Sequence, residues 1–463
     1  MGDTPRNRPP SVERLLVAVR ARLGPETRDA STLRQAARGV IDDERTRLRT
    51  NGARPTPAAE LAERVVERLA ALDSAWRVGV APVLNSTGVI VHTNLGRAPW
   101  PREAIEAAEA AAREPLLLEL DRDTGRRGHR YRAAEEALIE LTGAEDALVT
   151  NNNAAAVALA VGLAGRGGGI AVSRGELVEI GGGVRIPEII RRAGARLIEV
   201  GTTNRTRVED FEAALAEGRA KLVLRVHRSN FRLEGFTEDP EAGELAERAH
   251  RHGAIVVDDL GSGALLDTSR FGLAHEPMPG ERLAAGADVV TFSGDKLVGG
   301  PQAGLVVGRA EPIARMRRDP LARAMRPDKV TLAAVAATLG LYRAGRADTA
   351  IPVWRMIATP VAELRHRAEA LADRVGGELV ELHSTVGGGS LPGETLPSLG
   401  VALGDRHADR LVARLRQGSP SVVARIEAGC AVIDLRTVDP ARDSELASAI
   451  EVALAGERDG GAT

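Results

Sequence analysis

From about Pro82 onward, short apolar runs rich in β-formers alternate with alanine-rich amphipathic stretches. The runs are Ala147–Thr150, Ile170–Val172, Leu197–Val200, Leu222–Val226, Ile255–Val257, Val289–Phe292 and Leu305–Val307. Continuous apolar runs are typical of strands buried on both faces, and the stretches between them have the period of helices. This alternation predicts an α/β fold with a mostly parallel sheet covered by helices on both faces. Ligands of such sheets bind beyond the carboxyl ends of the strands.

The pattern differs at both ends of the chain and predicts three domains. Residues from Val12 to Trp76 are expected to form helices, with breaks near Gly24-Pro25 and around 51–55, which makes residues 1–80 a small helical domain. Residues 81–330 form the large α/β domain. After about Thr331 a long helical stretch precedes shorter strands and the glycine-rich segment 386–390, so residues 331–463 are expected to be a small α+β domain.

Composition narrows the functional classes only slightly. The 463-residue chain has a formal net charge of −2, so charge over the whole chain says nothing about partners. Residues 1–80 contain 15 Arg, no Lys and 11 Asp and Glu, a local charge of about +4 (15 − 11). Cys430 is the single cysteine, which excludes an internal disulfide and favours a reducing compartment, the cytoplasm. No apolar stretch reaches the length of about 18 residues that a membrane helix needs, so we expect no membrane segment.

The first candidate for chemistry is Lys296, in the glycine-rich turn that follows the run Val289–Phe292. A lysine at the carboxyl end of a strand is where an enzyme places the amine that binds pyridoxal 5′-phosphate (PLP) as a Schiff base. The flanking glycines allow the backbone to approach a ligand closely. The alternative is an exposed loop lysine.

Two carboxylates, Asp258 and Asp259, follow the run Ile255–Val257. PLP works as an electron sink when its pyridine nitrogen stays protonated, and a buried aspartate maintains that state. The alternative for one of them is a helix cap. We favour Asp259, because the Leu-Gly-Ser that follows it resembles the aspartate motif of fold-type I PLP enzymes.

A third strand end supplies an anion site. The run Ala147–Thr150 leads into Asn151, Asn152, Asn153 and Ala154, where a helix is expected to begin. Free N–H groups at a helix start bind phosphate, and amide side chains assist. Ser293 is a further candidate ligand for the cofactor's phosphate. The alternative is that these asparagines simply cap the helix.

Three arginines are candidates for a second anion, since the planar guanidinium suits phosphate. Arg97 lies in a Gly-x-Ala-Pro turn, and Arg323 and Arg326 are three residues apart on one helix face. On position alone, surface arginines are the simpler explanation. No spacing of histidine and cysteine indicates a metal site, and no glycine motif indicates a dinucleotide or an NTPase loop.

Taken together, the motifs resemble those of the bacterial selenocysteine synthases, the L-seryl-tRNA(Sec) selenium transferases, over nearly the whole chain. The strings that carry the resemblance are Pro10–Leu16, His92–Pro99, Gly125–Arg130, Asn151–Ala156, Ser173–Ile180, Asp259–Gly263 and Ser293–Gly304. Two positions depart from the family pattern, namely Arg228, where a small hydroxyl residue is expected, and His129, where serine is common.

The resemblance implies a fold-type I PLP enzyme that converts L-seryl-tRNA(Sec) to L-selenocysteinyl-tRNA(Sec) with selenophosphate. Water is eliminated to give a PLP-bound aminoacrylate, to which selenium then adds. Lys296 corresponds to the PLP lysine, and Arg97, Arg323 and Arg326 to the family's anion-binding arginines. Asp295, beside the lysine, is a candidate to assist departure of the hydroxyl.

The resemblance further implies that the N-terminal domain binds tRNA and that the chain forms a homodecamer, a pentamer of dimers. It implies no DNA partner. Two alternatives remain. One is a PLP-dependent lyase of the selenocysteine-synthase-like group that acts on a small amino acid or an amino sugar phosphate. The other is a noncatalytic RNA-binding scaffold.

Overall fold

The computed structural model describes residues 8–23, 30–51, 54–74, 81–128, 132–180, 183–229, 231–404 and 407–458. The chain divides into two compact units, Met1–Pro82 and Val83–Thr463. The predicted break at Gly24-Pro25 and the predicted helix end at Trp76 lie outside the described residues.

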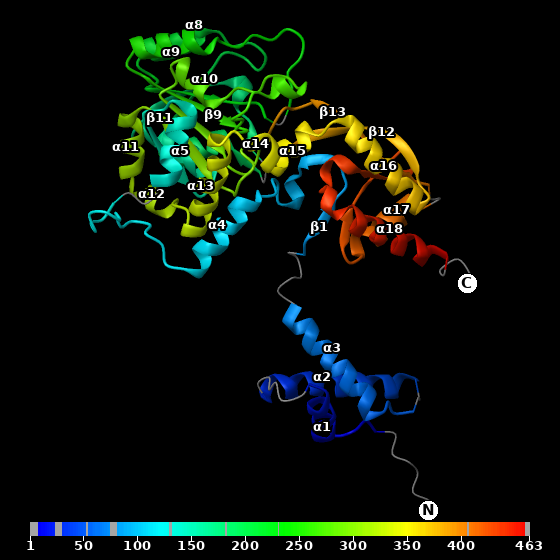
Figure 1. The fold of residues 1–463 in the computed structure, drawn as a ribbon. Coiled ribbons are helices and arrows are strands. Elements are labelled where there is room, and N and C mark those ends of the chain that lie inside the picture. Colours follow the sequence, from blue (N-terminus) through cyan, green and yellow to red (C-terminus); the bar gives the residue numbers. More distant parts are fainter. Residues whose placement is uncertain are drawn as a thin grey trace, which may run out of the picture. The chain divides into compact units, whose positions relative to one another are not determined.

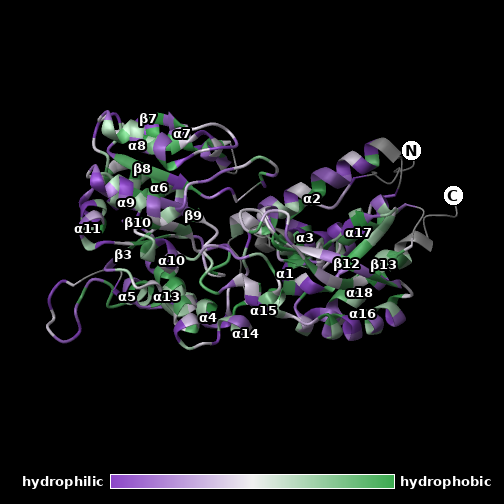
Figure 2. Ribbon diagram, turned by 90° about the horizontal axis from the view of Figure 1, so that it is seen from above, coloured by the Kyte–Doolittle hydropathy of each residue, from purple (hydrophilic) through white to green (hydrophobic). Residues whose placement is uncertain are grey.

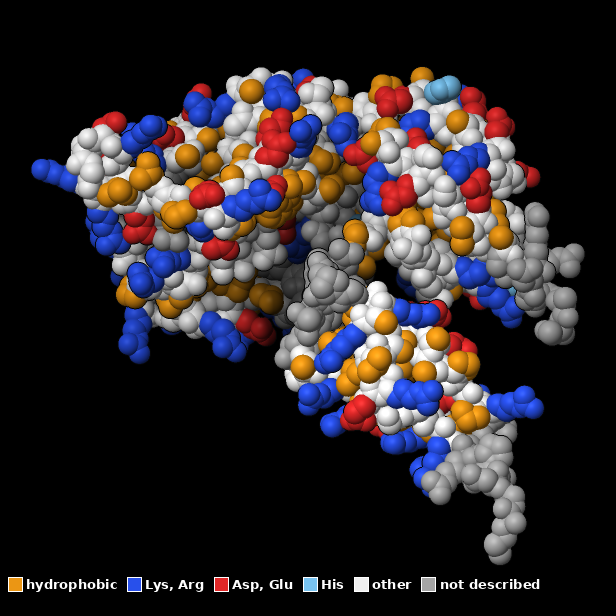
Figure 3. Space-filling model, turned by 60° about the horizontal axis from the view of Figure 1, so that its bottom comes forward, with side chains coloured by type: hydrophobic (Ala, Val, Ile, Leu, Met, Phe, Trp, Pro, Cys, Tyr) orange, Lys and Arg blue, Asp and Glu red, His pale blue; other side chains and the backbone are white. Residues whose placement is uncertain are grey.

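The N-terminal unit consists of helices α1 (Val12–Leu23), α2 (Ala30–Asn51) and α3 (Ala58–Ser74). Each helix is amphipathic, and together they bury one small core that includes Leu15, Ile41 and Leu61. Glu44 on α2 is only 1% exposed and is held by Arg47 and by Thr56, which precedes α3. Arginine side chains are spread over the outer surface of this unit (Figure 3).

A seven-stranded sheet forms the centre of the larger unit (Figure 1). Its strands, in spatial order, are β3 (Asp146–Thr150), β11 (Gly304–Gly308), β10 (Val289–Ser293), β9 (Ile255–Gly261), β8 (Leu222–Val226), β4 (Gly169–Ser173) and β7 (Arg196–Val200). Every predicted run lies in this sheet. All neighbours pair in parallel except those of β11, which is antiparallel to both β3 and β10. The predicted mostly parallel α/β fold is confirmed.

Helices cover both faces of this sheet, as its uniformly apolar strands require. The helices against one face are α6 (Asn153–Gly162), α7 (Ile186–Arg192) and α11 (Ala310–Arg318). The helices against the other face are α5 (Arg132–Thr142), α8 (Val208–Ala216), α9 (Ala242–Arg251) and α13 (Lys329–Arg343). The apolar residues in Figure 2 gather on the sheet and on the inner sides of these helices.

The C-terminal part of the same unit contains a five-stranded sheet in the order β15 (Arg425–Glu427), β16 (Cys430–Asp434), β13 (Thr395–Leu403), β12 (Glu378–Gly387) and β2 (Val89–Val91). Strand β1 (Val83–Asn85) pairs in parallel with β14 (Ser421–Val423). Helices α16 (Val361–Val375), α17 (Ala408–Gln417) and α18 (Asp443–Arg458) share a core with these strands (Figure 1).

The predicted border at residues 330/331 does not separate compact units, since 83–463 cluster as one. Helix α13 spans that border, and its Leu332, Val335 and Leu339 are buried in the core that contains α5 and β10. In the other direction, β1 and β2, assigned to the large domain by the sequence, pair with C-terminal strands. Among the described residues no helix is long and apolar enough to cross a membrane.

Candidate active site

A cavity of about 230 Å³ opens where strands β3, β8, β9 and β10 end. Its wall contains Arg97, Asn152, Asn153, Ala154, Val178, Val184, Val226, His227, Ser229, Asp259, Gly261, Ser293, Asp295, Lys296 and Gln302. The predicted site residues at all three strand ends are in this wall. Arg97 reaches it from the turn that follows η2 (Thr93–Leu95).

Lys296 lies in the turn between β10 and β11 and is only 7% exposed. Burial lowers the pKa of its ammonium group, and Arg97 adds to this, whereas Asp259, Asp295 and Glu276 oppose it. Glycines surround the amine. A Cβ on Gly389 would lie 2.5 Å from Lys296 Nζ, and one on Gly261 would lie 3.7 Å from it. The site therefore holds a desolvated amine, and at position 389 a residue without a Cβ leaves it room, whereas the distance at Gly261 is an ordinary contact.

The structure distinguishes the two aspartates, which lie within β9 rather than after it. Successive side chains of a strand point to opposite faces, so only one of them can enter the cavity. Asp259 is in the cavity wall, and its Oδ1 accepts hydrogen bonds from Asn153 Nδ2 (2.7 Å) and Thr291 Oγ1 (3.0 Å). Asp258 lies 3.5 Å from Arg282 instead. Burial raises the pKa of the Asp259 carboxyl, with partial compensation by its two donors and Lys296.

Helix α6 begins at the cavity. Asn152 is its N-cap, and its side chain accepts a hydrogen bond from Ala155 N at 2.9 Å. This residue therefore caps the helix, as the alternative interpretation of the asparagines expected. Ala154 and Ser293 lie in the cavity wall beside it. Asn153 binds Asp259, which leaves its buried Oδ1 without a hydrogen-bond partner among the described residues.

Arg97 forms an ion pair with Asp295, with Nη1 2.7 Å from Oδ2. Arg97 has a φ of 66°, a strained value for a residue with a side chain, and its chain neighbour Ala98 donates a backbone hydrogen bond to Asp295 O. Asp295 is 6% exposed and therefore buried beside the lysine, while the Arg97 side chain is 33% exposed.

The structure does not bring Arg323 and Arg326 into the Lys296 cavity of the same chain. They line a second cavity of about 450 Å³ at the outer side of β3, together with Arg127, Arg317 and Arg318. The two cavities have no lining residue in common, although Met325 O accepts a hydrogen bond from Asn151 N next to the first one. Sequence spacing placed these arginines on one face but could not show which cavity that face borders.

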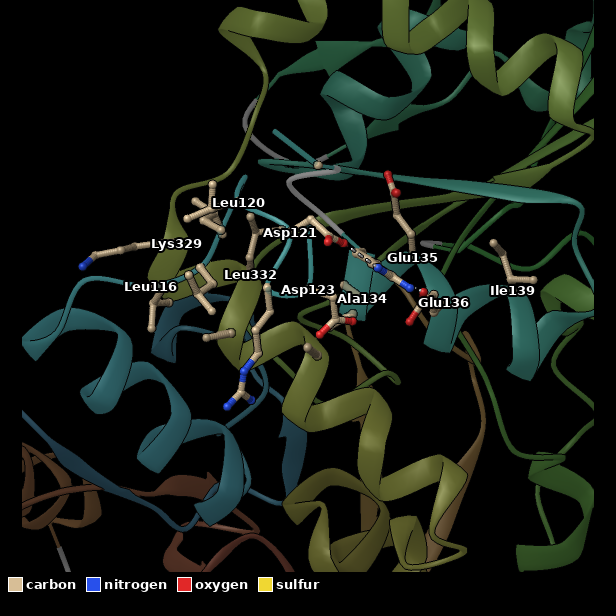
Figure 4. A pocket seen from close by; sticks show the side chains of 18 residues that line it. Leu116, Leu120, Asp121, Asp123, Ala134, Glu135, Glu136, Ile139, Lys329 and Leu332 are labelled. Carbon is tan, nitrogen blue, oxygen red and sulfur yellow. Dashed lines mark hydrogen bonds and ion pairs between the residues drawn. The ribbon is translucent and has the colours of Figure 1, made fainter. Parts of the chain in front are cut away.

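A larger cavity of about 770 Å³ contains none of the predicted site residues (Figure 4). Leu116, Leu120 and Leu332 lie close together in it, while Lys329 points away. Its wall is mainly apolar and has no buried amine or strand-end carboxylate. Position at the strand ends and unusual side-chain environment, not volume, identify the Lys296 cavity as the candidate site.

Sequence reasoning missed several residues around Lys296. Thr291 is a polar residue inside an apolar strand, a signal that was available. His227 follows β8, but in this segment only the neighbouring Arg228 was considered from the sequence. Gly389 was recognised as part of a glycine-rich segment without an assigned place. Ser262, only 1% exposed, has a buried hydroxyl with no partner in the described part of the chain.

The two departures from the family pattern have different outcomes. Arg228 is outside the cavity wall, because its guanidinium binds Gly175 O and Asp239. His129 lies outside the described residues. Within the described ranges, no group of three or more histidine, cysteine, aspartate or glutamate side chains is arranged to hold a metal ion.

Comparison with known proteins gives consistent matches. A family model described as L-seryl-tRNA selenium transferase matches residues 83–439. The L-seryl-tRNA(Sec) selenium transferase of Rhizobium meliloti is 44% identical over 440 residues, which are 92% of this chain and 93% of that protein. The protein of the same name from Carboxydothermus hydrogenoformans is 46% identical and covers 87% of each chain. A solved structure of D-glucosaminate-6-phosphate ammonia-lyase has a TM-score of 0.60 at 21% identity, covers 82% of this chain and 98% of its own, and shows a shared fold.

Proposed function

This chain belongs to the L-seryl-tRNA selenium transferase family, and we propose that it converts L-seryl-tRNA(Sec) to L-selenocysteinyl-tRNA(Sec) with selenophosphate as the selenium donor. The observation that carries the proposal is the buried Lys296 at a strand end, in a chain that matches the family along almost its whole length. The fold-type I architecture and the arrangement of the cavity support the same conclusion.

PLP is the cofactor that we propose for the Lys296 cavity, and the residues present fit it. Lys296 supplies the amine for the aldehyde, and Asp259 the buried carboxylate for the pyridine nitrogen. Both hydrogen bonds that Asp259 accepts go to Oδ1, so Oδ2 is suited to a cationic N–H. Ala154 and Ser293, at the start of α6 and the end of β10, are placed to bind the phosphate, with Asn152 holding the helix start. When bound, PLP withdraws electrons from the Cα atom of an amino acid.

The residues of this chain then handle protons and charge. Lys296 accepts the α-proton of the seryl group, because burial favours its neutral amine. Asp259, which is 4% exposed, stabilises positive charge at its side of the cavity. Thr291 and Asn153 hold Asp259 in position by hydrogen bonds. Arg97 and Asp295 form the polar wall next to Lys296.

We propose that Arg97, Arg323 and Arg326 bind the phosphate of selenophosphate. Arg97 is in the Lys296 cavity, whereas the other two line the neighbouring one. A homo-oligomer, proposed as a decamer built from five dimers, allows the arginine-lined cavity of one copy to meet the Lys296 cavity of another. A mixture of Lys296→Ala and Arg323→Ala/Arg326→Ala chains then regains activity that neither variant has alone. A mixture as inactive as its components contradicts sharing between copies.

The N-terminal unit is proposed to bind the tRNA. Its three helices expose many arginines, some of them paired only with exposed acids, such as Arg68 with Asp43. Phosphate groups compete well with such pairs, since exposed ion pairs contribute little stability. We place the protein in the cytoplasm, where its single cysteine stays reduced.

The test is incubation of the PLP-loaded protein with seryl-tRNA(Sec) and selenophosphate, followed by detection of selenocysteinyl-tRNA(Sec). The wild-type protein is expected to form it and Lys296→Ala to form none. Borohydride reduction and peptide mapping give a pyridoxyl adduct on Lys296. Unchanged seryl-tRNA defeats the proposal. Ammonia release from a small amino acid or amino sugar phosphate, without tRNA binding, establishes the lyase alternative, and tRNA binding without the adduct establishes a scaffold.

A further inference from the structure

The proposed reaction requires a proton for the serine hydroxyl. Hydroxide is a poor leaving group, so an enzyme that eliminates water supplies a proton to the departing oxygen. The sequence suggested Asp295 for this step. In the structure, Asp295 Oδ2 accepts a hydrogen bond from Arg97 Nη1 at 2.7 Å, so this carboxylate is already engaged with a cation. The same cavity wall contains a second candidate donor.

His227 is the one histidine in the cavity wall as the structure describes it. It follows β8, and its backbone N donates a hydrogen bond to Asp259 O at 2.8 Å, so its position is tied to that of the cofactor-binding strand. Its side chain is 21% exposed, while its Nδ1 is buried and has no hydrogen-bond partner within the described ranges. Imidazole is the side chain that most readily exchanges a proton near neutral pH.

Glu276 lies behind His227, with Oε1 3.6 Å from Nδ1. It is 2% exposed, its Oε1 also lacks a hydrogen-bond partner among the described atoms, and its backbone N is fixed by Thr268 Oγ1 at 2.9 Å. A buried polar atom without a hydrogen-bond partner destabilises the folded state, and here two such atoms face each other. A shift of a few tenths of an ångström joins them when Nδ1 carries a proton, and the carboxylate then stabilises the imidazolium.

We propose that His227 donates the proton to the β-hydroxyl of the seryl group and that Glu276 is the positioning residue that holds the imidazole protonated at Nδ1. The inference rests on the proposed function. Lys296 removes the α-proton, the electron pair left at Cα becomes the Cα=Cβ bond, and the Cβ–O bond breaks. The hydroxyl oxygen takes the proton from His227 Nε2 and leaves as water. His227 regains its proton from solvent.

The test separates the two proton transfers in His227→Gln. Exchange of the α-hydrogen of seryl-tRNA with D₂O reports on Lys296 and is expected to stay within about threefold of the wild-type rate, whereas formation of selenocysteinyl-tRNA falls about 100-fold or more, the usual contribution of a general acid. β-Chloroalanyl-tRNA, whose chloride leaves without a proton, reacts equally with variant and wild type. His250→Gln removes a comparable histidine from a carboxylate pair outside the cavity, with Asp288 at 2.9 Å, and is expected to change none of these rates.

Glu276→Gln keeps a hydrogen-bond acceptor but removes the charge. Its kcat is expected to fall with KM unchanged, and Glu276→Asp to recover part of the loss. In the protein without cofactor, diethyl pyrocarbonate is expected to modify His227 faster in Glu276→Gln, because no carboxylate then faces Nδ1 of the imidazole; mass spectrometry measures this. The inference is overturned if α-hydrogen exchange and selenocysteinyl-tRNA formation fall together in His227→Gln, or if β-chloroalanyl-tRNA reacts more slowly with this variant than with wild type. It is also overturned if the rate of His227 modification is the same in Glu276→Gln and wild type. Inactive wild-type protein defeats the proposed function instead.

Discussion

Gly389 is the position at which the close approach to Lys296 can be tested most directly. Its φ of 90° is one that alanine adopts only with strain, about 1–2 kcal/mol. In Gly389→Ala the new Cβ also lies 2.5 Å from Nζ and 2.7 Å from Cε of Lys296. The lysine end has to move in a buried space, and overpacking of this kind costs about 1–3 kcal/mol. We expect that cost to appear as displacement of the amine from the position at which it meets the cofactor.

We expect the dissociation constant for PLP to rise about 5- to 150-fold. This range corresponds to about 1–3 kcal/mol, since about 1.4 kcal/mol changes an equilibrium constant tenfold. The assay is titration of the protein with PLP, followed by absorbance and by borohydride trapping on Lys296. Gly376→Ala is the matched control, since Gly376 has a φ of 73° but a Cβ there meets nothing within 4 Å. It is expected to lose about 1–2 kcal/mol of unfolding free energy and no PLP affinity. Equal PLP binding by Gly389→Ala and wild type refutes the reasoning.

Two further predictions concern buried carboxylates. Asp259→Asn is expected to lower the transferase rate at least 100-fold, because the variant loses the charge that pairs with the cofactor. Asp258→Asn is the control: its partner is Arg282, and it is expected to change the rate less than about tenfold. Steady-state rates of the two variants test this. In the N-terminal unit, Arg47 lowers the pKa of Glu44 from 4.5 to about 2 despite burial. Because the Glu44 carboxyl has a lower pKa in the folded state, its ionised form stabilises the fold by at most about 3 kcal/mol of unfolding free energy. This contribution is complete above about pH 4.5 and is lost as the pH falls toward 2. Glu44→Gln at pH 7 is therefore expected to reduce hydrogen-exchange protection of α2 and α3, and the exposed Glu63→Gln to leave it unchanged.

The sequence predicted the sheet because strands buried on both faces have to be apolar throughout. It did not predict that β11 runs antiparallel, since apolar runs carry no direction. A signal was present: only residues 294–303 connect β10 to β11, and a parallel pair needs a crossover of about a dozen residues or more. Strand β1 pairs with a strand 338 residues later (421 − 83) and β2 with one 296 residues later (385 − 89), and such distant pairings left no local pattern to detect.

The same distinction applies to the candidate site. Lys296 and Asp259 could be found because each follows or ends an apolar run, and a parallel sheet gathers such ends at one edge. His227 has the same signal, because it directly follows the run Leu222–Val226. Gly389 and Glu276 could not be found, because each meets the site through contacts between elements far apart in the chain. Glu276 lies in a loop before α10 (Pro279–Ala284), where nothing distinguishes it from a solvated glutamate. The structure distinguishes Glu276 by its exposed fraction of only 2%.

The charges of the cavity explain why one chain is a poor place for two phosphate groups. Its wall contains Lys296 and Arg97 against Asp259 and Asp295, with Glu276 behind. With the cofactor's phosphate at the start of α6, as proposed, the cationic groups of the wall left for a second phosphate are Arg97, which is paired with Asp295, and His227, the proposed proton donor. A second phosphate therefore needs cations from elsewhere, and the arginine-lined cavity beside β3 is where this chain has them. In the assembly that we propose, a second copy brings those arginines to the site.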